Sequence, residues 1–184
     1  MIEMSAPPES DDLRARLAEA REVAEKTIIS MRRMISDLSP AILEQLGLAA
    51  AVRQLANRLR TSAGCNVTLE ISPFTPLQPY KQLVLYRVVQ QCFANIAQHS
   101  SARNINLSLS EADGVLRLDV EDDGVGFSVQ ERLGHPECFG LQGMRDRVYL
   151  IGGKFLVEST PKGKTRSTKS RSGARISVEV PADK

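Results

Sequence analysis

Apolar residues recur at intervals of three and four between residue 11 and about residue 38. This spacing predicts a long amphipathic helix with a charged outer face, and such a helix is stable only against a partner. Pro40 interrupts the pattern, because the residue before a proline is disfavoured in a helix. The helical period resumes over residues 40–59, and Gly64 is the expected C-cap. The apolar positions of the first helix are Leu13, Leu17, Ala20, Val23, Ala24, Ile28, Met31, Met34, Ile35 and Leu38.

Polar and apolar residues alternate in several short runs of the second part of the chain, which predicts β-strands. Two of these runs are joined by Glu-Ala-Asp-Gly at residues 111–114, a sequence typical of a β-hairpin. Helices are expected from about residue 80 to residue 98 and over residues 141–153, where paired glycines end the second one. The basic run at residues 161–173 is predicted to be disordered. The expected strands are residues 65–71, 103–110, 114–122, 154–160 and 174–181.

The predicted elements give the fold class. Their order is helix, helix, strand, helix, two strands, a long irregular loop, a helix and two strands. Because the strands gather in the second part, we expect an α+β fold in which a mixed sheet is backed by helices. A chain of 184 residues that is 42% hydrophobic is large enough for one compact domain with an appendage, or for two small domains.

Composition indicates the cellular compartment of the protein more clearly than its function. A formal charge of +2 is too small to argue for nucleic-acid binding. Cys65, Cys92 and Cys138 are odd in number and widely spaced, so neither a disulfide framework nor a zinc site is indicated. The sequence has no signal peptide and no apolar run long enough to cross a bilayer. A soluble protein in the reducing cytoplasm is therefore the expectation.

The helix over residues 88–100 raises the first chemical question. Its apolar face is broad, and Gln91, Asn95, Gln98 and His99 fall together on the other side at helical spacing. Such a stripe is usually the solvated side of a helix. It would face a ligand only if other chemical groups converge on it.

Two glycine motifs could supply those groups. Asp122 ends a predicted strand and is followed by Gly124 and Gly126, which would let the backbone turn and approach a flat ligand closely. Gly140 and Gly143 lie near the start of a helix, where free backbone N–H groups attract anions. Taken singly, each motif is more often a tight turn or an ordinary helix start. The amide oxygen of Asn95 could likewise complete the shell of Mg²⁺, or simply be solvated.

The joint order of these motifs is more specific. "LYRVVQQCFANIAQHSSA", "EDDGVGF" and "GLQGMRDRVYLIGG" follow one another along the chain. They closely resemble the motifs of the ATP-binding domain of sensor histidine kinases, in the subgroup related to nitrate-responsive sensors. Upstream, "ISDLSPAILEQLGLAAAVRQL" resembles the second helix of that family's dimerisation hairpin. The resemblance extends from about Leu13 to Pro181.

The resemblance implies a Bergerat-type α/β sandwich, as in gyrase and related ATPases, with ATP and Mg²⁺ as cofactors. Asp122 would bind the adenine amine, with Gly124 and Gly126 beside the base, and Asn95 would hold Mg²⁺ against the triphosphate. Residues 128–139 would form a lid. Arg145 and Arg147 either help to bind phosphates or belong to the solvated surface. The remaining nucleotide-binding positions implied by the motifs are His99, Gly140, Leu141 and Gly143.

The chain departs from the family at several positions. Gln91 stands where the family has an acid that would orient or activate the attacking nucleophile, and an amide cannot take its proton. Gln98 replaces a frequent Lys. Ala174 falls where a Thr usually supports the adenine site, unless Thr165 supplies that group through a different alignment. We expect nucleotide binding to be retained and phosphoryl transfer to be weakened.

The phosphoacceptor is also missing. His99 belongs to the nucleotide motif and His135 to the lid, so neither resembles the acceptor histidine of the family. We interpret the chain as a fragment of a longer kinase rather than a natural partial kinase. On this interpretation residues 1–10 are a flexible tail, residues 11–63 are a helical dimerisation and linker segment, and residues 64–184 are the catalytic domain, with a disordered insertion near 162–173.

The leading functional hypothesis is the ATP-binding catalytic part of a two-component histidine kinase. It would transfer the γ-phosphoryl group to a histidine on a dimerisation helix outside this chain, and it would work with a response regulator, as a homodimer, without nucleic acid or a membrane segment. The alternative is a catalytically weakened nucleotide-binding sensor or adaptor. Nucleic-acid binding through the basic run is the weakest hypothesis, because such runs are usually solvated loops.

Overall fold

The computed structural model describes residue 21 and residues 41–130, 139–163 and 172–183. It divides the chain into two compact units, Met1–Ala41 and Ile42–Lys184. Apart from Arg21, the predicted N-terminal tail and the first predicted helix lie outside the described residues, as does most of the basic run. The sheet, its helices and the candidate site belong to the second unit, whose first helix begins at Ala41.

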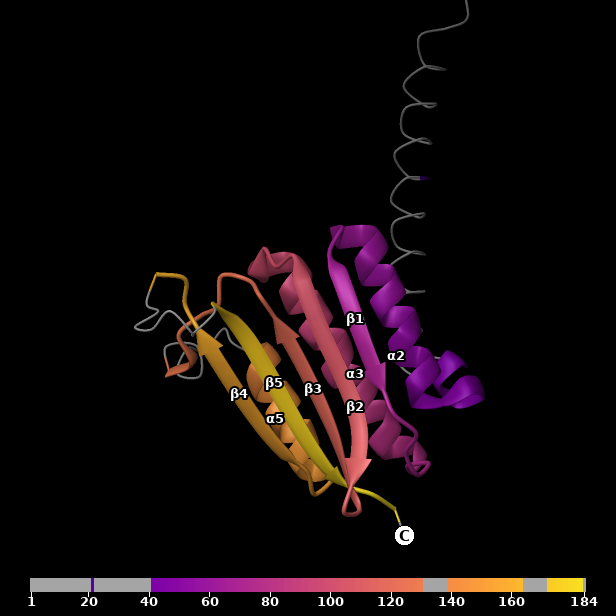
Figure 1. The fold of residues 1–184 in the computed structure, drawn as a ribbon. Coiled ribbons are helices and arrows are strands. Elements are labelled where there is room, and N and C mark those ends of the chain that lie inside the picture. Colours follow the sequence, from indigo (N-terminus) through magenta and orange to yellow (C-terminus); the bar gives the residue numbers. More distant parts are fainter. Residues whose placement is uncertain (1–20, 22–40, 131–138, 164–171, 184) are drawn as a thin grey trace, which may run out of the picture. The chain divides into compact units, whose positions relative to one another are not determined.

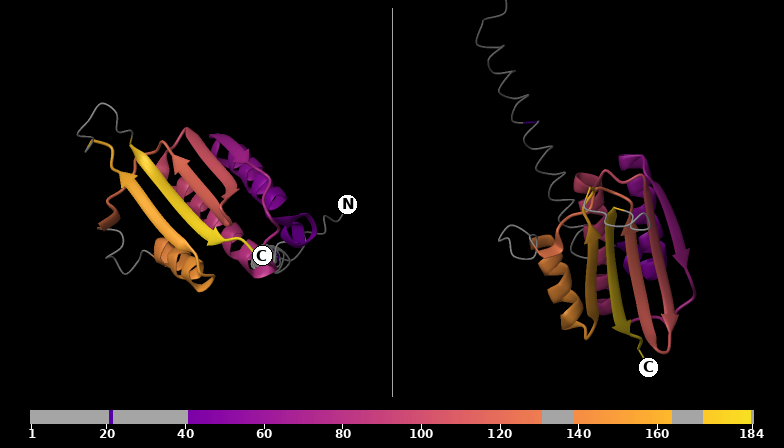
Figure 2. Two further views of the ribbon diagram at one scale, coloured as in Figure 1. Left: turned by 60° about the horizontal axis from the view of Figure 1, so that its bottom comes forward. Right: turned by 60° about the vertical axis from the view of Figure 1, so that its left-hand side comes forward.

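The second unit contains a mixed sheet of five strands, which lie in the order β1-β2-β3-β5-β4. β1 pairs with β2 in parallel, and the other neighbours are antiparallel. Figure 1 shows the helices α3 and α5 behind the sheet, and Figure 2 shows from two further directions that they lie on one side of it. The α+β fold expected from the sequence, a mixed sheet backed by helices, is thereby confirmed. The strands are β1 (Asn66–Ile71), β2 (Asn104–Ala112), β3 (Val115–Asp122), β4 (Lys154–Thr160) and β5 (Gly173–Pro181).

Alternation of apolar and polar residues along the three central strands creates the core. Every second side chain of β2, β3 and β5 is buried against the helices, because successive side chains of a strand point to opposite faces. The helices contribute a matching apolar face, in which Leu85, Val88 and Val89 of α3 (Pro79–Asn95) and Met144 and Val148 of α5 (Phe139–Leu150) are almost fully buried. The strand residues of this core are Ile105, Leu107, Leu109, Leu116, Leu118, Val120, Ile176, Val178 and Val180.

α2 (Ala41–Ala63) departs from the continuous helix that its period predicted. Gly47 has a φ of 75° and a ψ of 178°, so two helical pieces meet there at a kink. Glycine permits this conformation, which costs other residues steric energy. The N–H of Leu48, freed by the kink, donates to Oε1 of Gln82 over 3.1 Å. At the other end Gly64 has a positive φ and its N–H donates to the carbonyl of Arg60, which confirms the predicted C-cap.

The helix predicted for about residues 80–98 is also different in detail. α3 is α-helical to Asn95 and continues as one π-helical turn, η1 (Ile96–Ser100). Ser101 follows with a left-handed φ of 51°. Single π-helical turns occur frequently at functional sites, since they shift the side chains that follow relative to a regular helix.

The hairpin predicted at residues 111–114 is confirmed. β2 and β3 are joined by Asp113 and Gly114, whose φ angles are 53° and 71°. Two successive positive φ angles define the type I′ turn, and its twist matches that of the strands. The pairing of the two strands places Asp122, at the end of β3, directly opposite Ile105 of β2.

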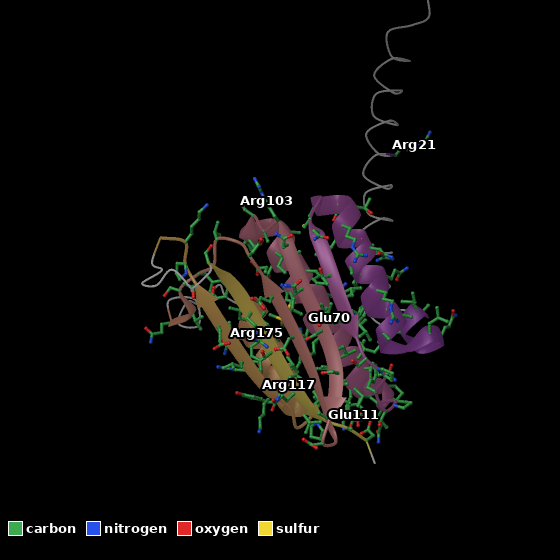
Figure 3. All side chains as sticks on the ribbon, in the orientation of Figure 1. Arg21, Glu70, Arg103, Glu111, Arg117 and Arg175 are labelled. Atoms are coloured by element: carbon green, nitrogen blue, oxygen red, sulfur yellow. The ribbon has the colours of Figure 1, made fainter. Side chains whose placement is uncertain are left out.

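The face of the sheet away from the helices is polar. Asp119 on β3 accepts hydrogen bonds from Arg175 and Ser177 on β5, and Arg117 pairs with Glu179 over 2.5 Å. The hydrogen bond and charge of Asp119 raise the pKa of the Arg175 guanidinium. Figure 3 shows Arg117 and Arg175 on this face.

A buried lysine ties the end of the chain to the start of α3. Nζ of Lys81 donates to Oδ1 of Asp183 over 2.6 Å and to the carbonyl oxygen of Pro181 over 2.9 Å. Oδ2 of Asp183 accepts the backbone N–H of Gln78. The hydrogen bonds from Lys81 and Gln78 lower the pKa of the Asp183 carboxyl.

Within the described residues, no helix is long and apolar enough to cross a membrane.

Candidate functional site

A cavity of about 330 Å³ opens between the helix layer and the ends of the central strands. Its walls come from the last turns of α3, from η1, from the loop after β3, from the start of α5 and from β5. The four polar residues of the stripe, Gln91, Asn95, Gln98 and His99, all line it. The stripe therefore faces a cavity rather than open solvent alone.

Asp122 lines this cavity beside Ser100 and is only 7% exposed. Its Oδ1 accepts the backbone N–H of Gly124 over 2.9 Å, and this oxygen and Oγ of Ser100 would each lie 2.7 Å from a Cβ on Gly124. Burial raises the pKa of the Asp122 carboxyl, although the Gly124 N–H and the Ser100 hydroxyl favour the ionised form. A carboxylate in this position can accept a hydrogen bond from a ligand amine.

The glycines after Asp122 are required by close packing. A Cβ on Gly124 would lie 2.3 Å from the carbonyl oxygen of Ser100, and one on Gly126 would lie 2.1 Å from that of Thr160. Any side chain at either position would force the loop away from its neighbours. Gly126 lines the cavity, whereas Gly124 lies behind it and shapes the turn.

A pair of amides lines the cavity further back along α3. Nε2 of Gln91 donates to Oδ1 of Asn95 over 3.0 Å. Gly140, at the start of α5, packs directly against this pair, since a Cβ there would lie 3.3 Å from Nε2 of Gln91 and 3.8 Å from Oδ1 of Asn95. Gly140 and Leu141 both line the cavity, so the first turn of α5 borders it.

The remaining candidate residues divide between the cavity and its surroundings. Gly143 does not line the cavity; the guanidinium of Arg147 lies against it, with NH1 3.5 Å from the position of a Cβ. Nε of Arg145 lies 3.5 Å from the carboxylate of Asp146. Neither arginine lines the cavity.

Ala174 lines the cavity and is the direct partner of Asp122 in the β3–β5 register. Its methyl group offers no hydrogen bond there. Thr165 and His135 lie outside the described residues, as does the central part of the predicted lid, residues 131–138.

Two residues that sequence reasoning did not single out belong to the site. Ser100 contacts Asp122, as described above, and Cys92 lines the cavity floor. Burial, and then the charge of Asp122, raise the pKa of the Cys92 thiol to about 12, so it stays protonated at neutral pH and is not a nucleophile. The period of α3 places Cys92 on the apolar face, but no local signal in the sequence relates Ser100 to Asp122.

The side chains that line the cavity suit Mg²⁺ bound together with a nucleotide better than a metal ion held by protein ligands alone. Among the described residues, no cluster of three or more His, Cys, Asp and Glu side chains could hold a metal ion. The cavity offers the neutral amide oxygen of Asn95, and its one lining carboxylate among these residues belongs to Asp122. Mg²⁺ commonly takes few protein ligands and completes its octahedron with water and substrate phosphates.

Comparison with known proteins agrees with this geometry. The sequence profile of the family described as histidine kinase-, DNA gyrase B-, and HSP90-like ATPase matches residues 80–184. The sensor histidine kinase NarS of Mycobacterium tuberculosis is 32% identical over 167 residues, which are 89% of this chain and 38% of that protein. The sensor histidine kinase MctS of Rhizobium johnstonii is 30% identical over 157 residues, 84% of this chain and 34% of that protein. The chain thus spans just over a third of the length of either relative.

The fold is also similar to that of solved histidine kinases. The blue-light activated histidine kinase of Erythrobacter litoralis EL346 superposes with a TM-score of 0.61 at 18% identity, covering 98% of this chain and 64% of that chain. The resemblance inferred from the sequence motifs is confirmed by these findings. The chain therefore belongs to the histidine kinase-, DNA gyrase B-, and HSP90-like ATPase family, and it corresponds to the catalytic ATPase domain of sensor histidine kinases.

Proposed function

We propose that the cavity binds ATP with Mg²⁺, and that the chain transfers the γ-phosphoryl group to a histidine on a dimerisation helix outside it. One observation carries this proposal. One cavity is lined by a buried carboxylate, Asp122, beside Ser100, and by the Gln91–Asn95 amide pair beside the start of α5, five to nine residues back from Ser100 along α3 and η1. A ligand that spans both groups meets a hydrogen-bond acceptor at Asp122 and amides with a helix N-terminus at Gln91 and Asn95.

These two groups of side chains match the two ends of ATP. The carboxylate of Asp122 accepts a hydrogen bond from the adenine amine, Gly126 lines the cavity beside the base, and Gly124 shapes the turn that holds the carboxylate. The backbone N–H groups at Gly140 and Leu141, which line the cavity, would be available to the phosphates, because the first N–H groups of a helix have no intrahelical partner. His99 and Gln98 also line the cavity. Gly143, which lies outside the cavity lining, makes room for the guanidinium of Arg147 one turn further along α5.

Asn95 is the residue that would hold the metal, through Oδ1. Mg²⁺ neutralises charge on the phosphates and supplies much of the electrostatic stabilisation in phosphoryl transfer. In the reaction the bond between the γ-phosphorus and the β,γ-bridging oxygen breaks, and a bond from a nitrogen of the acceptor imidazole to that phosphorus forms. ADP leaves with the bridging oxygen.

Gln91 limits what this chain can contribute to that step. An amide can orient an imidazole or a water molecule by hydrogen bonding, but it cannot take up a proton at neutral pH. Its Nε2 is moreover engaged with Asn95. Catalysis would then rest on positioning and on electrostatic stabilisation alone, which predicts slow transfer.

The partners follow from the same proposal. A histidine-bearing helix must be supplied by a longer chain or in trans, and the phosphoryl group then passes to a response regulator in the cytoplasm. Residues 11–63 would form the helical dimerisation and linker segment of a homodimer, and residues 64–184 the catalytic domain.

Binding of a non-hydrolysable ATP analogue, measured by calorimetry with and without Mg²⁺, tests the nucleotide assignment. We expect binding that Mg²⁺ strengthens, and much weaker binding of the matching GTP analogue, because guanine presents a carbonyl where adenine has its amine. Equal affinity for the two nucleotides would overturn the role of Asp122.

A second candidate function is a nucleotide-binding sensor or adaptor without kinase activity. The amide at Gln91 is the observation that favours it, whereas the relatives named above are sensor histidine kinases and favour the enzyme. Transfer of labelled phosphate from ATP to a supplied histidine-bearing dimerisation hairpin separates the two. Binding without any transfer over hours would favour the adaptor.

A further inference from the structure

Ser100 is the last residue of the π-helical turn that follows α3. It is half-buried, lines the cavity, and precedes the left-handed Ser101 at which the chain leaves the helix. The proposed function gives it no role. Its contacts nevertheless join the end of the α3–η1 helix to the loop after β3, which are two separate walls of the cavity.

The hydrogen bonds of the Ser100 hydroxyl assign its proton. Its Oγ accepts the backbone N–H of Ala102 over 3.0 Å. A hydroxyl has one donor hydrogen in addition to its acceptor lone pairs, and an ionised carboxylate can only accept. The hydroxyl hydrogen is therefore left for the neighbouring Asp122 carboxylate, since Oγ of Ser100 and Oδ1 of Asp122 would each lie 2.7 Å from a Cβ on Gly124.

The backbone of Ser100 is held in the same place. Its carbonyl oxygen accepts the N–H of Val125 over 2.8 Å. A Cβ on Gly124 would lie 2.7 Å from both Oγ of Ser100 and Oδ1 of Asp122. The absence of a side chain at Gly124 thus allows Ser100 and Asp122 to approach each other. The turn after β3 and the π-helical turn pack directly against one another.

Few other groups can orient this carboxylate. Ala174, directly opposite Asp122 on β5, has only a methyl group. The N–H of Gly124 donates to Oδ1 but lies in the same short turn as Asp122 itself. Among the described residues, Ser100 brings a side-chain hydroxyl beside Asp122 from another element of the fold.

We propose that Ser100 is a positioning residue for base recognition: its hydroxyl fixes the rotamer of Asp122 so that the remaining lone pairs of the carboxylate face the cavity and select an exocyclic amine. The inference rests on the proposed function, since the amine would be that of adenine. A purely structural Ser100 would stabilise the turn but would not affect discrimination between bases.

The test compares two ligands by calorimetry on the full chain. One is a non-hydrolysable ATP analogue, and the other is the same compound with unsubstituted purine in place of adenine, which lacks the amine. Ser100→Ala should weaken the adenine compound about five- to tenfold, as expected for losing support of a hydrogen bond to a charged group, and the purine compound by less than twofold. Ser100→Thr keeps the hydroxyl and should restore most of the adenine preference.

Ser108→Ala is the matched control, since Ser108 lies on the open face of β2 opposite Asp119 and away from the cavity. It should change neither affinity. Equal losses for both compounds in Ser100→Ala, or no loss for either, would overturn the inference. Failure of the wild-type chain to bind either compound is a different result, because it would overturn the proposed function on which the inference rests.

A second readout needs no nucleotide. Carbon-13 NMR titration of the carboxyl of Asp122 in the free protein should place its pKa higher in Ser100→Ala than in the wild type, because a hydrogen bond to the ionised form has been removed. An unchanged titration would show that Ser100 does not hold the carboxylate, whatever the affinities.

Discussion

Gln91 and Asn95 are joined across one turn of α3 by a hydrogen bond of 3.0 Å from Nε2 to Oδ1. In the proposed function the acceptor is the oxygen that would hold Mg²⁺, and the donor stands where the resemblance to the family implies an acid. The pair thus satisfies its own polar groups inside the cavity, and nucleotide binding must share or break that contact. The engaged Asn95 oxygen and the amide at Gln91 both bear on the rate of the proposed phosphoryl transfer.

Gln91→Glu should accelerate phosphoryl transfer to a supplied histidine hairpin. A general base typically contributes about 10²–10⁴-fold, so even partial restoration should be measurable with labelled ATP. Affinity for ATP should change little with Mg²⁺ present and fall slightly without it, because a new carboxylate near the triphosphate repels it. A wild-type chain that already transfers at the rate of related kinases, with no gain in the variant, would show that this position never needed an acid. Gln90→Glu, whose parent side chain bonds Arg87 instead, is the matched control.

Asp122→Asn should weaken ATP by roughly tenfold or more, since a hydrogen bond to a charged group contributes on the order of 1.5–3 kcal/mol. Thermal stability should fall less, because burial already disfavours the charge. The raised pKa of Asp122 adds a pH dependence: protonation removes the negative charge that strengthens the hydrogen bond from the amine, so affinity should decline in mild acid, above the usual titration range of an aspartate. Calorimetry between neutral and acidic pH measures both effects. A folded variant with unchanged affinity would remove Asp122 from the site.

Lys81 and Asp183 should stabilise the fold in a pH-dependent manner. Because the pKa of Asp183 is lowered in the folded chain, its contribution is present above the unfolded pKa and is lost as pH falls through the folded pKa. Asp183→Asn should therefore lower Tm by a few degrees at neutral pH, about 2–4 °C, with the difference from wild type closing in acid. Glu70→Gln, at an exposed position on β1, serves as the control and should show no such difference. A deficit that persisted unchanged at low pH would contradict the assignment.

The N-terminal segment should mediate self-association. The apolar stripe at residues 13–38 has the period of a helix that needs a partner, and we predict a dimer through it, weaker than one with a complete hairpin. Leu17→Asp combined with Ile28→Asp should give monomers in sedimentation, whereas Arg21→Ala, at an exposed position, should not. A clean wild-type monomer at high concentration would count against the dimer.

Local sequence determined those features whose cause is local. Alternation fixed the inward and outward faces of β2, β3 and β5, because the side-chain period of a strand is two. Asp113 and Gly114 determined the hairpin, since both tolerate positive φ. The order of the motifs was sufficient to infer the family and the fold. The same residues did not determine the kink at Gly47 or the π-helical turn at Ile96–Ser100, because helical period is insensitive to one irregular turn.

Tertiary structure decided how the chemical groups meet. The helical stripe of residues 91–99 is equally compatible with solvent and with a cavity, and only its packing opposite β3 and α5 resolves that choice. The contact of Ser100 with Asp122 joins elements separated by 21 intervening residues, so no local pattern encodes it. The glycine at position 124 is readable as a turn, but the reason a side chain is excluded there is the carbonyl of Ser100, 2.3 Å from where its Cβ would lie. Such contacts arise only when the π-helical end and the loop after β3 are packed together, which depends on the whole sheet rather than on either segment.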